Sequence, residues 1–163
     1  MKYIISTIIS IALLAGVYYV WNLQNNSNDT INEQAVLLYY FNQEKDKDTS
    51  GNIQCSRQGL EPVSRKISSD NIIEDTIKLL LRGELSAEER ARGVTTEYPL
   101  SGVELIKSEL NNGTLTLTFS DPNNKTGGGS CRVGILWFQI EATAKQFPEV
   151  KQVKFLPEEL FQP

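Results

Sequence analysis

The chain has 163 residues, of which 40% are apolar and 22% are charged, a composition typical of one globular domain with short extensions. Its formal net charge is -4, which argues against nucleic acid as a partner because such binding depends on basic side chains that displace counterions. The chain has no histidine, which excludes Ser-His-Asp and Cys-His nucleophile systems, histidine zinc sites and the usual general base at neutral pH.

The first 21 residues predict a single transmembrane anchor. An uncharged stretch runs from Tyr3 to Trp21, and as a helix it would span roughly 28 Å, close to the hydrocarbon core of a bilayer. Lys2 would then stay in the cytoplasm, and the rest of the chain would lie outside the cytoplasmic membrane. The alternative is a cleaved signal peptide, although the bulky pair Tyr18 and Tyr19 gives cleavage a poor site.

A tether and two strands are predicted next. Residues 22–34 are polar and rich in asparagine, so they predict a flexible linker. The run AVLLYYF at 35–41 is β-prone and continuously apolar, which predicts a buried strand and the start of a folded domain covering 35–156. After a polar loop, LEPVSRKI at 60–67 predicts an edge strand or the start of a strand because it contains proline.

The following segment predicts an amphipathic helix. Asp70 or Asn71 is a good N-cap, and Asn71 together with Glu74 resembles a capping box. Gly83 closes the helix, and residues 84–93 predict a short helical turn. The apolar residues of the main helix fall on one stripe, formed by Ile73, Ile77, Leu80 and Leu81.

A hairpin, a second helix and a last strand complete the expected domain. The Asn-Gly turn within 111–113 joins strands at 103–110 and 114–120, the second of which alternates apolar and polar residues. The remaining pattern predicts a helix at 130–146, a strand at 149–155 and a tail at 157–163. This order indicates an α+β fold with a small mixed sheet of about five strands packed by two main helices.

The glycine-rich loop before the second helix raises the question of phosphate binding. A Walker loop needs Lys and then Ser or Thr after its last glycine, and a dinucleotide loop needs glycine where Arg132 stands. We therefore interpret Gly127, Gly128 and Gly129 as a structural loop and Ser130 as the helix cap. Weak anion binding at the helix N-terminus is the alternative.

A second loop has the spacing of a calcium site. Asp46, Asp48 and Ser50 occupy the first ligand positions, and Gly51 follows where the sharp turn is needed. Arg57 stands where a bidentate glutamate should be, and its positive charge opposes metal binding. These three residues are therefore weak candidates, a solvated loop is the alternative, and neither a metal nor any other cofactor is expected.

The other candidate groups predict no catalytic site. Glu88 and Glu89 are adjacent, so on a helix they point apart and cannot act as a paired acid and base; we interpret them as surface charges. Cys55 and Cys131 would lie outside the cytoplasm, where a disulfide between them would stabilise the fold by a few kcal/mol. The alternative is that they are two unrelated buried residues.

From Ala35 to Phe155 the chain resembles a GerMN domain, the module named after a sporulation and germination lipoprotein. The resemblance rests on an ordered set of segments: VLLYYF, LEPVSRKI, IIEDTIKLLLRGELSAEE, YPLSGVELIKSELNNGTLTLTFS, GGGS and QIEATAKQFPEVKQVKF. It implies a compact α+β fold similar to ring-building modules, with a noncatalytic role outside the cytoplasmic membrane and a structural role for the glycine-serine motif. The chain departs from the family in having Val17 where the lipid-bearing cysteine would stand.

The leading hypothesis is a membrane-anchored extracytoplasmic interaction module, possible partners being other envelope proteins or further copies of the chain. Binding would use a sheet edge or an exposed helix surface. The alternative is a binding domain for an envelope glycan or peptide, and an enzyme is the third class. Four aromatic residues distinguish the first two hypotheses: Tyr39, Tyr40, Tyr98 and Trp137. Their exposure in a groove would favour the glycan or peptide ligand, whereas their burial would favour the interaction module.

Overall fold

The computed structural model describes residues 33–162 and, within the N-terminal segment, Gly16, Tyr18, Tyr19 and Trp21. The chain divides into two units, Met1–Asn32 and Glu33–Pro163. Most of the expected anchor at 1–21 and of the linker at 22–34 lies outside the described residues. Within the part of the chain that the structure describes, no helix is both long enough and apolar enough to cross a membrane.

The folded unit contains two three-stranded sheets, which corrects the expectation of one sheet of about five strands. The first sheet is antiparallel with the order β2-β1-β3, and its strands are β1 (Gln34–Asn42), β2 (Leu60–Ile67) and β3 (Val94–Thr95). The second has the order β4-β5-β6, with β4 and β5 antiparallel and β5 and β6 parallel; its strands are β4 (Glu104–Asn111), β5 (Thr114–Ser120) and β6 (Gln152–Leu156).

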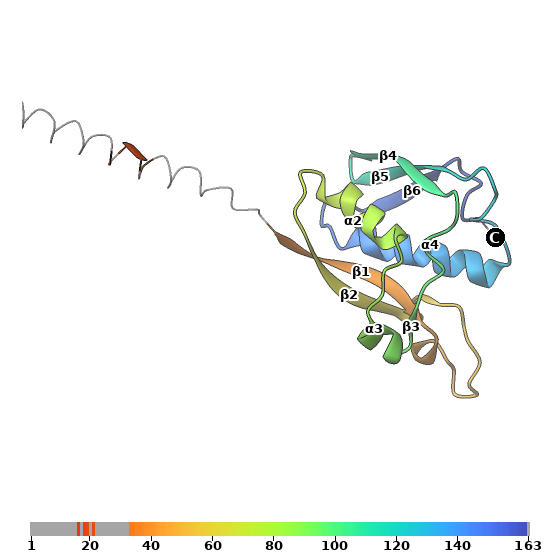
Figure 1. The fold of residues 1–163 in the computed structure, drawn as a ribbon. Helices are drawn as coiled ribbons and strands as arrows, with labels where there is room; N and C mark the ends of the chain where they lie inside the picture. The colour runs from red at the N-terminus through yellow and green to blue at the C-terminus, as the bar shows by residue number, and fades with distance from the viewer. Residues whose placement is uncertain (1–15, 17, 20, 22–32, 163) are drawn as a thin grey trace, which may run out of the picture. The chain divides into compact units, whose positions relative to one another are not determined.

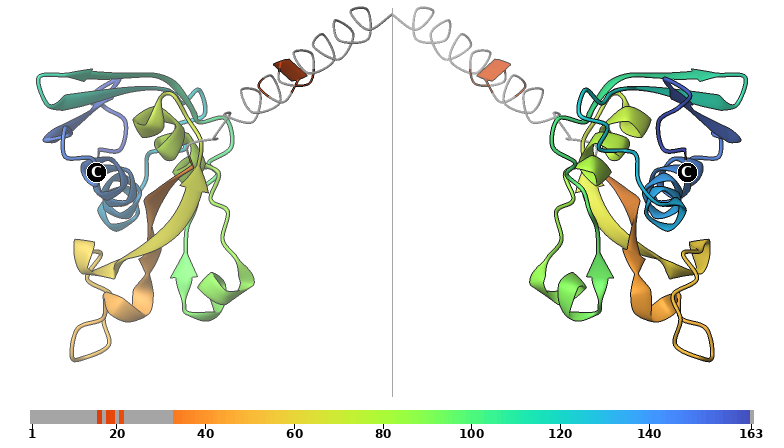
Figure 2. Two further views of the ribbon diagram at one scale, coloured as in Figure 1. Left: turned by 90° about the vertical axis from the view of Figure 1, so that its left-hand side faces the viewer. Right: turned by 90° about the vertical axis from the view of Figure 1, so that its right-hand side faces the viewer.

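Two helices lie between the sheets, as Figure 1 shows. They are α2 (Ile72–Leu81) and α4 (Ser130–Lys145), whereas the short α3 (Ala87–Ala91) lies beside β3 at the far end of the first sheet (Figure 2). Both sheets turn an apolar face toward α2 and α4, and the side chains of the two sheets and of these two helices form one core. Burial from two sides explains why α4 carries apolar residues around much of its circumference.

The stretch of β1 that precedes its two residues paired with β3 explains why the strands form two sheets. Gln146 donates its amide N–H to the carbonyl oxygen of Leu37 at 2.7 Å and accepts the Leu37 N–H at 2.8 Å. Thr143 Oγ1 accepts the Tyr39 N–H at 3.0 Å. Side chains at the end of α4 therefore occupy hydrogen-bonding positions that a strand of the second sheet would otherwise take, and along this stretch β1 has no strand beside it except β2.

Several local predictions are confirmed. The strands at 60–67 and 114–120 have the predicted bounds, and the hairpin turns at Asn112 and Gly113, whose φ angles are 49° and 81°. Gly83 follows α2 with φ of 64°, and a side chain there would collide with the carbonyl oxygen of Tyr98. Glycine is therefore required both by the backbone conformation and by the close approach of another segment.

The helix caps differ from the prediction. Asn71 precedes α2, but its side chain makes no capping hydrogen bond. The capping box belongs instead to α3, where Ser86 accepts the Glu89 N–H and Glu89 accepts the Ser86 N–H. The N-cap of α4 is Gly129, so Ser130 is the first residue of the helix and not its cap. A glycine N-cap is well tolerated because its backbone adopts the required extended conformation easily.

The C-terminal residues are part of the core, which corrects their interpretation as a tail. Phe161 is fully buried, and its ring lies 5.4 Å from Phe119 and 5.0 Å from Phe155, measured between ring centroids. Leu160 is buried beside it. The folded unit therefore extends past β6, because these apolar side chains cover the open end of the second sheet.

Glu89 is buried and ion-paired, which corrects its interpretation as a surface charge. Arg65 donates to both carboxylate oxygens, at 2.7 and 2.8 Å. These hydrogen bonds lower the pKa of Glu89 from 4.5 to about 2. Because the folded-state pKa lies below the unfolded value, the pair stabilises the fold above pH 4.5, and this contribution is lost as the pH falls toward 2.

The free energy of unfolding should record this loss. Between pH 6 and pH 3 we expect the wild type to lose ~2 kcal/mol that a Glu89→Gln variant does not lose. Urea unfolding followed by circular dichroism at each pH measures the difference. Glu149→Gln is the control, because the Glu149 side chain is exposed. Parallel pH profiles for the wild type and Glu89→Gln would contradict the assignment.

Candidate functional site

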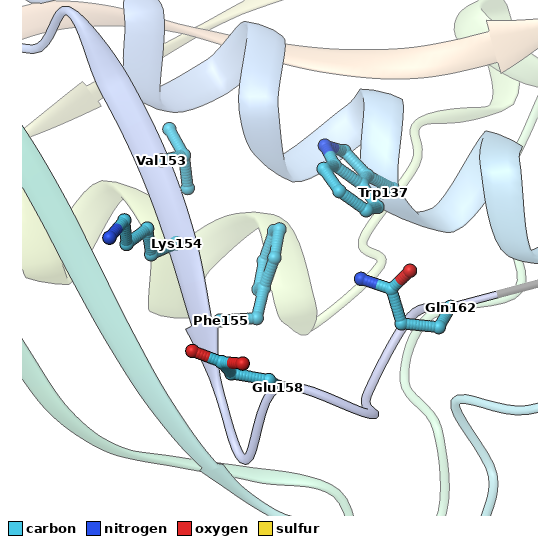
Figure 3. A pocket seen from close by; sticks show the side chains of 6 residues that line it. All are labelled: Trp137, Val153, Lys154, Phe155, Glu158 and Gln162. Atoms are coloured by element: carbon cyan, nitrogen blue, oxygen red, sulfur yellow. The ribbon is translucent and has the colours of Figure 1, made fainter.

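A groove of about 430 Å³ opens beside β6 and is the best candidate for a binding site. Figure 3 shows β6 along one side, α4 behind and the C-terminal segment returning along the other side. Six side chains line the groove: Trp137, Val153, Lys154, Phe155, Glu158 and Gln162. Its walls are aromatic and aliphatic, with a few polar groups, which is the usual composition of a ligand site in proteins.

Packing against the core fixes the aromatic wall of the groove. Trp137 and Phe155 meet edge to face, with their ring centroids 5.3 Å apart and their planes at 68°. Phe155 also contacts Phe119 and Phe161. The last turn of the chain therefore supports the wall indirectly, since Phe161 packs behind Phe155.

One polar atom in this wall has no partner. The indole N–H of Trp137 is buried and finds no hydrogen-bond acceptor among residues 33–162. Figure 3 shows the nitrogen on the side of the ring that faces β6. A buried donor without an acceptor costs free energy. Because the nitrogen is covered, an incoming carbonyl or hydroxyl oxygen would recover this free energy only after a neighbouring side chain moves aside.

The groove adjoins a strand edge. β6 pairs with β5 on one side, and within the described part of the chain no strand pairs with it on the other. Lys154 and Glu158 are exposed beside this edge and carry opposite charges. The arrangement joins main-chain hydrogen-bonding groups to an apolar recess, the combination used in β-strand addition.

A second, smaller cavity of about 150 Å³ contains no arrangement typical of catalysis. Glu97 is its only carboxylate, and Arg132 pairs with it at 2.6 Å. Thr96 Oγ1 and the Gln139 side-chain oxygen are hydrogen-bonded to each other at 3.2 Å. Across residues 33–162, no group of three or more acidic or cysteine side chains is placed to hold a metal ion.

The predicted disulfide is present. Cys55 and Cys131 are bonded, with their Cα atoms 5.2 Å apart, and the bond joins the loop between β1 and β2 to the first turn of α4. Arg57 reinforces this attachment by forming an ion pair with Glu141 and by lying 4.1 Å above the ring of Phe138. The loop is therefore held on α4 by one covalent and two noncovalent contacts.

The glycine-rich loop is held closed by a side chain of α4, the helix that follows it. Arg132 donates to the carbonyl oxygens of Lys125, at 3.0 Å, and Gly127. Gly128 has φ of 140°, and a side chain there would lie 3.3 Å from Arg132. Arg132 is thus engaged in holding the loop and in its pair with Glu97, which accords with a structural role for the glycines.

The two aspartates of the calcium-like loop accept hydrogen bonds from backbone N–H groups of other residues in the same loop. Asp46 is buried and accepts the Ser56 N–H at 3.1 Å. Asp48 accepts the N–H groups of Ser50 at 2.8 Å and Asn52 at 2.9 Å, and the Asn52 bond is the main cause of its lowered pKa. These contacts close a hairpin that is anchored by the buried Asp46 and whose residues 47–54 are exposed.

The four tyrosine and tryptophan side chains are placed differently from one another. Tyr40 and Tyr98 are buried, and their hydroxyls donate to the carbonyl oxygens of Leu80 at 3.3 Å and Leu136 at 3.0 Å. Burial raises the pKa of Tyr40 to about 12. Tyr39 and Trp137 are half-buried, and only Trp137 lines the groove.

The fold defines a class of small α+β domains with two helices between two sheets. Residues 37–159 match the Germane family, described as sporulation and spore germination, and the chain belongs to this family. The predicted resemblance is thereby confirmed.

Two solved structures are similar to this chain. The tandem GerMN domains of the sporulation protein GerM from Bacillus subtilis have 21% identity and a TM-score of 0.52, over 78% of this chain and 40% of that one. The chain thus spans less than half of that relative, and the similarity establishes the fold. A putative lipoprotein from Clostridium perfringens has 16% identity and a TM-score of 0.39, over 79% of this chain and 77% of that one. No curated protein matches the sequence.

Proposed function

We propose that the chain is a noncatalytic interaction module of the bacterial cell envelope, anchored in the cytoplasmic membrane with its folded unit outside. The uncharged stretch from Tyr3 to Trp21 supports the anchor. The disulfide supports an oxidising compartment, because such bonds persist mainly outside the cytoplasm. Membership of a family described as sporulation and spore germination supports a place in an assembly of that kind, such as a ring.

The binding mode that the geometry supports best is strand addition at β6. An extended segment of another envelope protein would pair with the open edge of β6 and insert an apolar side chain beside Trp137 and Phe155. The Trp137 N–H would donate to a carbonyl oxygen of that segment. The observation that carries this proposal is the groove itself, which places an aromatic wall and a buried donor next to an unpaired strand edge.

A glycan is the second candidate ligand, and the composition of the groove favours it over other small molecules. Trp137 offers an aromatic surface, while Glu158 and Gln162 offer an acceptor and an amide for hydroxyl groups. Such a mixture of one aromatic surface with few polar groups suits an amphipathic ligand. The strand edge does not contribute to this mode, so the two candidates make different predictions.

Site-specific photocrosslinking in native membranes tests the proposed function. A photoreactive residue replaces Lys154 at the groove, or Lys66 on β2 as the matched exposed control, in the full-length chain. We expect a crosslinked protein in the membrane fraction from position 154 only. Trp137→Phe should lower its yield roughly fivefold, because this change keeps an aromatic ring but removes the donor. Mass spectrometry then identifies the joined peptide.

Three outcomes would reject strand addition at the groove. The first is an equal yield from positions 154 and 66, and the second is an unchanged yield after Trp137→Phe. The third is crosslinking to cell-wall material without any joined peptide, which would support the glycan. A soluble full-length product would reject the anchor separately.

A further inference from the structure

β4 is an edge strand with exposed apolar side chains. Within residues 33–162 no strand pairs with its outer side, and Figures 1 and 2 show the hairpin of β4 and β5 at the periphery of the domain. Ile106 and Leu110 are 60% and 37% exposed on this strand. An open edge with apolar side chains is a template for pairing with another strand.

The hairpin turn determines which backbone groups of β4 point outward. The two-residue turn makes Asn111 and Thr114 a hydrogen-bonded pair, so Glu109 and Lys107 also bond to β5 in the observed register. The N–H and C=O groups of Ser108 and Leu110 therefore point away from β5. They are available to a strand that adds at the outer edge.

The sequence of β4 is self-complementary in one of the registers that these groups allow. In an antiparallel pair centred on Ser108, Lys107 of each copy lies opposite Glu109 of the other, and Ile106 lies opposite Leu110. Lys107 and Glu109 share one face of the strand, as their 2.9 Å ion pair within one copy shows. The pair would therefore form a four-charge cluster beside two apolar contacts.

Neighbouring registers are less favourable. Centring the pair on Lys107 would place two lysine side chains directly opposite each other. Centring it on Leu110 would shorten the overlap to a few residues, because the turn follows at Asn112. The bulge between Leu105 and Lys107 ends the regular edge on the other side.

We propose that the outer edge of β4 is a self-association site, at which two copies of this chain pair antiparallel about a two-fold axis through Ser108. The contact is short, so it is weak for free molecules. Confinement of both copies to one membrane would raise their effective concentration. The site is separate from the groove at β6 and does not depend on the ligand proposed for that groove.

Disulfide trapping tests the register in full-length protein in membrane vesicles. Ser108→Cys would place the two introduced thiols in a directly opposed pair, within disulfide reach, and both native cysteines are already bonded to each other. Mild oxidation should give a covalent dimer on a non-reducing gel. The matched control is Thr116→Cys on β5, which lies one strand further from the axis in each copy and should give none.

Charge reversal gives the decisive comparison. In the Ser108→Cys background, Lys107→Glu or Glu109→Lys should lower the dimer yield about tenfold, because like charges then face each other twice. The double reversal should restore the yield. Equal trapping at positions 108 and 116, or a double variant as poor as the singles, would overturn the proposal. Circular dichroism melting confirms that these substitutions, at two exposed and two half-buried positions, leave the fold intact.

Discussion

Replacing Cys55 and Cys131 together by serine is expected to lower the free energy of unfolding by ~4 kcal/mol. The bond closes a loop with a sequence separation of 76 residues, and the chain-entropy model assigns a stabilisation of this size to such a loop. Urea unfolding of the folded unit, followed by circular dichroism, measures the change. The loss should come mainly from the unfolded state, which becomes less restricted when the link is absent.

Reductant provides the control for this first prediction. Cys131 is exposed, so reductant can reach the bond. Wild-type protein in excess reductant should unfold like the double serine variant, and the variant itself should not respond. If reductant leaves the wild-type midpoint unchanged although mass spectrometry shows two thiols, the disulfide does not stabilise the fold as proposed.

The second large effect is expected at the end of the chain. Phe161→Ala should lower the free energy of unfolding by about 3–5 kcal/mol, the range for removing a fully buried aromatic ring. Its ring contacts Phe119 and Phe155 inside the core. Gln162→Ala is the matched control, because this neighbour is exposed and its loss should change stability by less than about 0.5 kcal/mol.

The Phe161 variant also links stability to the candidate site. Phe161 supports Phe155, which forms the wall of the groove with Trp137. We therefore expect Phe161→Ala to reduce photocrosslinking from position 154 even at temperatures where the variant is folded. Equal stability of Phe161→Ala and Gln162→Ala would show that the last residues are a tail after all.

Local patterns predicted the regular elements closely, as β2, β5 and the hairpin turn show. The reason is physical: alternating apolar residues, the Asn-Gly pair and the spacing of Ile73, Ile77 and Leu80 act over a few neighbouring residues. β3 was missed because two residues that pair with Phe41 and Asn42 carry no local signal. The interpretation of 157–163 as a tail is wrong because two apolar residues, Leu160 and Phe161, between polar neighbours carry no periodic signal, and Phe161 is buried only by contact with rings distant in the sequence.

The candidate site was only partly visible in the sequence. Trp137 was singled out as an aromatic residue whose exposure would matter, and it does line the groove. The other wall residues come from β6 and from the last turn, and their approach to Trp137 depends on how β6 pairs with β5. Glu89 was similarly misjudged, since its partner Arg65 lies on a different element.

The sequence by itself determined the α+β class, the order of the principal helices and strands, and the family, because these depend on periodicity and on motifs that neighbouring residues carry. Only the tertiary structure decided that the strands form two sheets, that Cys55 meets Cys131 and that a groove opens beside β6. Each of these joins residues far apart in the chain, and such contacts are fixed by the packing of the whole core around α2 and α4.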